Sequence, residues 1–334
     1  FGSSPRACAR GSLERAFCPW LRRQRRPAMS SQGEDLVKQA EAKLKGGFWS
    51  NLMGGPKYEE ASDLYVMAAN QFKLAKEWEK AAECFKQCAY CAEKNTASFG
   101  SSADAAQHLQ EAGNMLKKIS SSMAKEQYEK AVGILQDNGR FPQAAKLNLQ
   151  VAEMLEAERL EHTEVKAFYK RAADLFELDD HGKSNLTKCM LKVAEYSAKD
   201  GAEGIAEAIK IFESEGEKAL GNNLLQFGAK DHFLRAGILH MATGDSVNAS
   251  LANERYRGLD PRFASSREGW REPILPGELL GKLVEAFENN DVSQFVDALT
   301  EYDSITKLDA WKIEFLTKVK ESMAPTAADE LDLT

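Results

Sequence analysis

Small and apolar residues recur at helical spacing from residue 33 to about residue 255. A short pattern returns several times: a large side chain, charged residues, a pair of small residues, and then apolar residues. It surrounds Ala61, Ala81 and Ala105, and a related copy surrounds Ala144. The first three alanines are 20 and 24 residues apart. These intervals predict one helix and one turn each, and therefore a helical hairpin about every 40 residues.

The small residues have a physical role in this interpretation, because antiparallel helices that approach within about 8–10 Å need small side chains where they cross. The alanine stripe alone also fits other helical bundles. The repeat favours an all-α fold with a tetratricopeptide-like solenoid of helical hairpins over residues 29–255, and helical periodicity resumes from Glu278 to Met323. We expect an inserted loop at about 269–278, which contains Pro and Gly, and a flexible acidic tail over 324–334.

The charge of the chain is unevenly distributed. The net charge is −7, but residues 1–28 hold seven Arg and one Glu, which leaves 37 basic and 50 acidic side chains, or −13, for the remainder. Such an acidic body repels phosphate and argues against nucleic acid as a partner. We expect residues 1–28 to be a disordered leader or a segment upstream of a native start at Met29, with a targeting peptide as the alternative.

The residues that usually carry catalysis form no motif. The five His share no pattern with an acid, Cys or Ser, and no phosphate-binding GxxxxGK[ST] loop is present. Cys84, Cys88 and Cys91 are spaced i, i+4, i+7, which is one stripe of a helix, and Cys189 stands alone. This spacing predicts buried thiols rather than a metal site. We therefore expect no enzymatic activity, no cofactor and no metal.

One loop stands out because glycine pairs flank four large apolar residues, Phe48, Trp49, Leu52 and Met53. The glycines disfavour helix, so the loop presents these side chains on a tip. Lys43, Lys45 and Lys57 lie beside it and suit anionic headgroups. We expect the tip to touch a membrane; the alternative is that it packs into the first groove between helices.

Four segments, residues 48–61, 65–78, 188–196 and 301–311, resemble the α type of the soluble NSF attachment protein (SNAP) family. The resemblance extends over about residues 33–334, and it implies a right-handed solenoid that ends in a C-terminal helical bundle over 256–323. It implies an adaptor that binds assembled SNARE four-helix bundles of the syntaxin type and recruits the hexameric N-ethylmaleimide-sensitive fusion ATPase (NSF). It also implies several copies per SNARE complex, and a cytoplasmic protein peripheral to the cytosolic face of membranes that takes part in vesicle fusion.

The resemblance also implies binding residues. Basic positions similar to the SNARE-facing surface of the family are Lys76, Lys117, Lys118, Arg140, Lys146, Lys188, Lys230 and Arg267. Positions similar to its ATPase contacts are Asp245, Glu285, Glu288 and the penultimate Leu333, whereas Asn289 replaces a Glu that the family tends to carry.

Two other functions remain open at this stage. A generic helical-repeat scaffold that binds a peptide in its groove would need only the repeat pattern. An organellar import-related repeat protein would rest on the Arg-rich residues 1–28 alone. Three features favour the SNARE adaptor: the apolar loop, the basic positions and the acidic tail that ends near Leu333.

Overall fold

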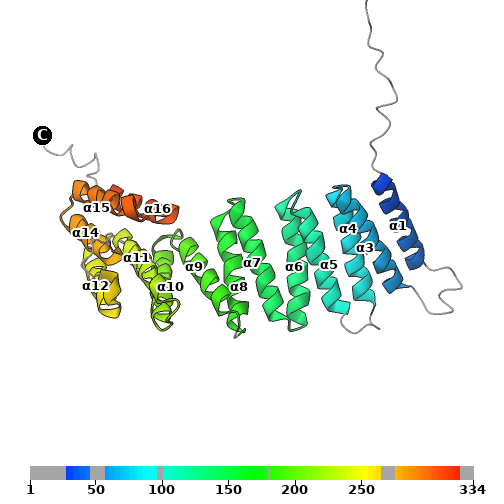
Figure 1. Ribbon diagram of the computed structural model, residues 1–334, viewed down its shortest axis with the longest axis horizontal. Helices are drawn as coiled ribbons and strands as arrows, with labels where there is room; N and C mark the ends of the chain where they lie inside the picture. Colours follow the sequence, from blue (N-terminus) through cyan, green and yellow to red (C-terminus); the bar gives the residue numbers. More distant parts are fainter. Residues whose placement is uncertain (1–27, 46–56, 96–100, 180, 265–274, 324–334) are drawn as a thin grey trace, which may run out of the picture. The chain divides into compact units, whose positions relative to one another are not determined.

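A computed structural model of the chain describes residues 28–45, 57–95, 101–179, 181–264 and 275–323 (Figure 1). Every regular element in these ranges is an α-helix, so the all-α prediction is confirmed. None of the helices in these ranges combines the length and hydrophobicity needed to cross a bilayer. The chain divides into two compact units, Phe1–Ile134 and Leu135–Thr334, which are called unit 1 and unit 2 below.

Unit 1 is built from consecutive helices that pack side by side, α1 on α3, α3 on α4 and α4 on α5. Its alanines Ala61, Ala81 and Ala105 are fully buried, as the sequence pattern predicts. The helices are α1 (Ala28–Lys45), α3 (Tyr58–Leu74), α4 (Trp78–Lys94), α5 (Ser101–Leu116) and α6 (Ser121–Asp137), the last of which crosses the division between the units.

Unit 2 begins with helices that continue the hairpin pattern, each packed on the next. Alternate helices run in the same direction, so the turns that precede α7, α9 and α11 lie at one edge (Figure 1). These helices are α7 (Phe141–Ala157), α8 (His162–Glu177), α9 (Lys183–Ser197), α10 (Gly201–Leu220) and α11 (Gln226–Ala242).

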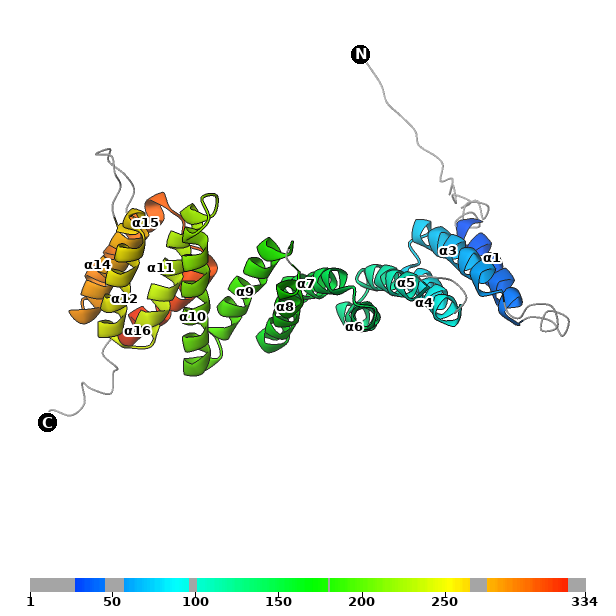
Figure 2. The same cartoon turned by 90° about the horizontal axis from the view of Figure 1, so that it is seen from below.

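The last helices of unit 2 gather around α10 and α11 (Figure 2). They share one hydrophobic core with them, in which Phe212 and Phe233 contact Trp311 and Tyr256 respectively. The predicted division after residue 255 falls within α12 and stays a prediction. The helices are α12 (Ser246–Leu259), α13 (Pro261–Ala264), α14 (Pro276–Glu288), α15 (Val292–Ile305) and α16 (Ala310–Met323).

The predicted loop at 269–278 ends earlier than expected. Leu275 is extended, and helix α14 begins at Pro276. Proline suits this first helical position because its fixed φ is helical and its missing N–H needs no partner there. Residues 269–274 lie outside the described residues.

Candidate functional site

In unit 1, the expected SNARE-binding residue Lys76 lies in the turn between α3 and α4. Its φ of +59° is left-handed, and the Glu77 amide donates to the Phe72 carbonyl across the turn at 2.9 Å. This is the bonding pattern that ends many helices, usually around a glycine. The backbone of Lys76 is therefore fixed by the turn, while its side chain is exposed.

Lys117 and Lys118 lie in the turn that follows α5, and both are exposed. Their amides donate to the carbonyls of Gly113 and Met115, which closes the end of the helix. Within unit 1, this turn lies at the same edge as the turn that carries Lys76 (Figure 1). The structure thus gathers the three lysines of unit 1 at one edge.

In unit 2, the described basic residues lie at or near the starts of three helices that run in the same direction. Arg140 precedes α7, Lys146 is in its second turn, Lys188 is in the second turn of α9, and Lys230 is near the start of α11. The N-terminal end of a helix carries a partial positive charge, so the helices add to the field of these side chains. This edge of unit 2 is called the basic edge below, and the ends of α8 and α10 also bring the exposed Glu177 and Glu217 to it.

Lys188 has an intramolecular partner that the sequence did not predict. Its Nζ donates to Oε1 of Glu153 on α7, and both side chains are about half exposed. Exposed ion pairs of this kind contribute little to stability, so an acidic partner can displace Glu153 at low cost. Glu153 therefore competes with any ligand of Lys188.

The structure also shows an apolar group at the basic edge that sequence reasoning missed. Leu224, Leu225 and Phe227 lie at the start of α11, with exposed fractions of 88%, 55% and 67%. The guanidinium of Arg262 lies 5.4 Å from the centre of the Phe227 ring and donates to the Gln226 side chain at 2.7 Å. Three large apolar side chains beside Lys230 form a surface that a partner can cover. The adjacent Leu224 and Leu225 in the sequence are the signal that could have revealed this surface.

Three of the four expected ATPase-binding residues lie in or beside other helices of unit 2. Asp245 is the N-cap of α12, since its Oδ1 accepts a hydrogen bond from the Asn248 amide at 2.9 Å. This residue therefore has a structural role whether or not it contacts a partner. Helix α12 packs against α14, whose last turn carries the exposed Glu285 and Glu288. Acidic groups at a helix C-terminus are unfavourable for the helix itself, which favours a role in binding.

Six of the expected contact residues lie outside the described residues: Phe48, Trp49, Leu52, Met53, Arg267 and Leu333. Their assignments stay predictions that rest on the sequence.

The four thiols in the part of the chain that the structure describes are buried, as predicted. Cys84, Cys88, Cys91 and Cys189 are free and buried. Burial raises the pKa of Cys84 and Cys88 to about 12, and that of Cys91 and Cys189 to about 11. Almost no thiolate forms at neutral pH, and the thiolate is the nucleophilic form. In the ranges that the structure describes, no cluster of His, Cys, Asp or Glu is arranged to hold a metal ion.

Unit 1 also contains an open groove of about 650 Å³ between α1 and α4. Its floor includes Tyr65, Phe72 and Cys84, and charged residues of α1 and α4 form its rim. Such a groove is what a peptide-binding scaffold would use, and its rim carries as many acidic as basic side chains, so its charge favours neither an acidic nor a basic ligand.

Comparison with known proteins gives one consistent family. The family model described as "Soluble NSF attachment protein, SNAP" matches residues 31–324. An alpha-soluble NSF attachment protein of Vitis vinifera is 37% identical over 303 residues, covering 91% of this chain and 98% of its own. One of Mus musculus is 37% identical over 301 residues, covering 89% and 96%. Among solved structures, BtubC from P. vanneervenii aligns over 73% of this chain and 96% of its own, with 13% identity and a TM-score of 0.38, too low to support an argument about fold.

Proposed function

The chain belongs to the soluble NSF attachment protein family, and we infer that it is a non-enzymatic adaptor in SNARE disassembly. In this role it binds assembled SNARE complexes and recruits the NSF ATPase, which performs all nucleotide hydrolysis. The observation that carries this inference is the family match over residues 31–324. A generic peptide-binding scaffold is less well supported, because the repeat pattern alone would not produce similarity along nearly the whole chain.

The SNARE complex is expected to contact the basic residues. SNARE bundles of the syntaxin type present acidic surface, and dispersed lysines allow contact without one fixed register. In unit 2, Arg140, Lys146, Lys188 and Lys230 supply this charge, and Leu224 adds apolar area beside it. Several copies of the chain around one bundle would strengthen the attachment by avidity.

The inference is tested by reconstitution. The full chain is mixed with fluorescently labelled SNARE bundles, the ATPase, ATP and Mg²⁺, and bundle disassembly is followed. We expect disassembly that depends on both the chain and ATP hydrolysis, and co-purification of the chain with each partner. A chain that co-purifies with neither partner and supports no disassembly would exclude the adaptor function. A parallel protein that starts at Met29 tests whether residues 1–28 affect either activity.

We further propose that the chain is peripheral to the cytosolic face of membranes and that Phe48, Trp49, Leu52 and Met53 make this contact. Each large side chain that enters the membrane gains roughly 1.5–3 kcal/mol before ordering costs, so one loop is a weak anchor. Phe48→Ser with Trp49→Ser should slow disassembly of liposome-anchored SNARE bundles more than that of soluble bundles. An equal effect on both would exclude the membrane role.

At the C-terminal end, Asp245, Glu285 and Glu288 are proposed to attract basic residues of the ATPase, and Leu333 to supply a local apolar contact. Leu333→Ala should leave SNARE binding unchanged and reduce disassembly, because the defect lies in coupling to the ATPase. Disassembly at the wild-type rate at limiting adaptor concentration would show that the tail has no such role.

A further inference from the structure

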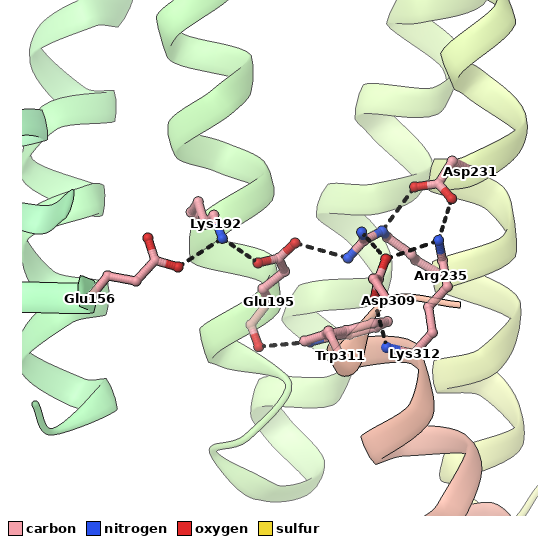
Figure 3. A network of polar contacts seen from close by, with 8 residues as sticks. All are labelled: Glu156, Lys192, Glu195, Asp231, Arg235, Asp309, Trp311 and Lys312. Atoms are coloured by element: carbon pink, nitrogen blue, oxygen red, sulfur yellow. Dashed lines mark hydrogen bonds and ion pairs between the residues drawn. The ribbon is translucent and has the colours of Figure 1, made fainter. Parts of the chain in front are cut away.

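Arg235 of α11 lies at the centre of an ion-pair network inside unit 2 (Figure 3). Its side chain is only 14% exposed and donates to three carboxylates from different parts of the chain. The distances are 2.9 Å to Glu195 on α9, 3.0 Å to Asp231 on α11, and 2.8 Å to Asp309 just before α16. One guanidinium therefore connects α11 with both α9 and α16.

Helix α16 contributes a second cation to this network. Lys312 has a side chain that is 9% exposed, and its ammonium group pairs with Asp231 and, at 3.1 Å, with Asp309. Asp309 also accepts a hydrogen bond from the Lys312 amide at 2.9 Å, so it caps the helix that it anchors. The start of α16 is thus held to α11 by two ion pairs of opposite sense: Asp309 pairs with Arg235 of α11, and Lys312 pairs with Asp231 of α11.

The network continues into the helices that carry the basic edge (Figure 3). Lys192 of α9 bridges Glu195 at 2.9 Å and Glu156 of α7 at 2.8 Å. Lys188, Lys192 and Glu195 are spaced i, i+4, i+7 and share one face of α9. The Lys188–Glu153 pair, the Lys192 bridge and the Arg235 cluster therefore form one row from α7 to α16.

The network resists separation because its two cations are largely buried, while the carboxylates that they pair with stay partly exposed: the side chains of Asp231 and Asp309 are 44% and 40% exposed. Burial opposes ionisation of Asp231, but Lys312 and Arg235 outweigh it, so the pKa of Asp231 lies below its usual value. Burial likewise opposes ionisation of Asp309, and its bond from the Lys312 amide together with the Arg235 and Lys312 charges lowers its pKa. Moving α16 away from α11 would take partners from Arg235 and Lys312, whose side chains are poorly solvated, and this is unfavourable. The ion pairs therefore oppose the separation of α16 from α11.

We propose that Asp309, Lys312 and Arg235 are positioning residues that transmit force from the C-terminal end of the chain to the basic edge. This proposal rests on the adaptor function proposed above. Helix α16 ends at Met323, and residues 324–334 with Leu333 follow it directly. A pull by the ATPase on this tail reaches α9 and α11, which carry Lys188 and Lys230, through α16 and therefore needs α16 to stay in place.

The test compares three substitutions in the full chain. Lys312→Met removes the charge that α16 contributes and keeps side-chain length. Lys312→Arg keeps the charge. Lys282→Met is the matched control, because Lys282 pairs with Glu301 at 3.0 Å between α14 and α15 and its ion-pair partners, Glu278 and Glu301, are not part of the network. SNARE binding, ATPase binding and the single-turnover rate of SNARE disassembly are measured for each, and circular dichroism checks that each variant is folded.

We expect Lys312→Met to bind both partners like wild type and to disassemble SNARE bundles about two- to thirtyfold more slowly, the range by which mutations in coupling networks act. Lys312→Arg and Lys282→Met should keep the wild-type rate. Disassembly by Lys312→Met at the wild-type rate would overturn the proposal. A loss of SNARE binding in the same proportion as the loss of rate would also overturn it, because the network would then only support the fold.

A measurement without partners separates this proposal from the adaptor function. Spin labels at the exposed positions of Lys210 on α10 and Lys320 on α16 report the distance between these helices, with Cys8 and Cys18 replaced by Ser. The distance distribution should broaden in Lys312→Met and stay narrow in Lys282→Met. An unchanged distribution in Lys312→Met would show that the network does not hold α16. A wild-type chain that supports no disassembly would refute the adaptor function, whatever the distances show.

Discussion

The indole Nε1 of Trp311 donates a hydrogen bond to the backbone carbonyl of Glu195, 3.1 Å away and 116 residues earlier in the chain. The same indole packs edge-on against Phe212 at 5.5 Å, and the Arg235 guanidinium lies 5.2 Å from its centre. Helix α16 is thus tied to α9 by a directional bond as well as by charge. The bond fixes the position of the last described helix of the chain.

Trp311→Phe should destabilise the protein without changing its fold. The substitution removes the indole N–H and leaves an aromatic ring, so the lost hydrogen bond costs about 0.5–1.5 kcal/mol, and the smaller ring adds to this. Urea unfolding monitored by circular dichroism measures the change. Trp78→Phe, at the less buried start of α4, is the control. Equal effects of the two substitutions would contradict the role of the Trp311 bond.

Glu153→Gln should strengthen SNARE binding. The substitution removes the charge that pairs with Lys188 and leaves this lysine available to an acidic partner. Because exposed pairs contribute about 0.2–1 kcal/mol, the affinity should rise by up to about fivefold at low salt. Titration at two salt concentrations measures this effect, which should weaken as salt rises. Glu126→Gln breaks an exposed pair with Lys130 on α6 and should change nothing. If Glu153→Gln raises the affinity for SNARE bundles no more than Glu126→Gln does, Glu153 does not compete with the bundle for Lys188.

Leu224→Ser combined with Phe227→Ser should weaken SNARE binding in a way that depends little on salt. A large apolar side chain contributes roughly 1.5–3 kcal/mol when fully buried, so at least a tenfold loss of affinity is expected. Val247→Ser with Leu251→Ser removes similarly exposed apolar residues from α12 and serves as the control. If the two double variants bind SNARE bundles equally well, the apolar group at the basic edge is not a contact.

The ion-pair network should lose its contribution to stability in acid. The pKa values of Asp231 and Asp309 lie below the unfolded value of about 3.9, so unfolded chains take up protons first as the pH falls. The contribution is therefore complete above about pH 4 and is lost as the pH falls through the folded pKa values. The difference in unfolding free energy between wild type and Lys312→Met should be constant from pH 7 to pH 5 and shrink below pH 4. A difference that persists at pH 3 would contradict this assignment.

Periodicity alone predicted the helices, because an element that buries one face must place small and apolar residues at helical spacing. It predicted the buried cysteines of α4 for the same reason. Similarity of sequence supplied the family and the basic and acidic positions. Asp245 illustrates the limit of such similarity, because its capping bond to Asn248 gives the residue a structural role that the family comparison does not reveal.

The tertiary structure decided which charges meet. Glu153 and Lys188 are 35 residues apart, and Arg235 and Asp309 are 74 apart, and no local pattern links either pair. Charged residues on helix surfaces look alike in sequence, because any of them can remain in water. Only the packing of α7, α9, α11 and α16 removes some of them from water and forces them to pair. The sequence by itself therefore determined the helices and the family, and the packing of distant helices determined the ion-pair network and the apolar group beside the basic edge.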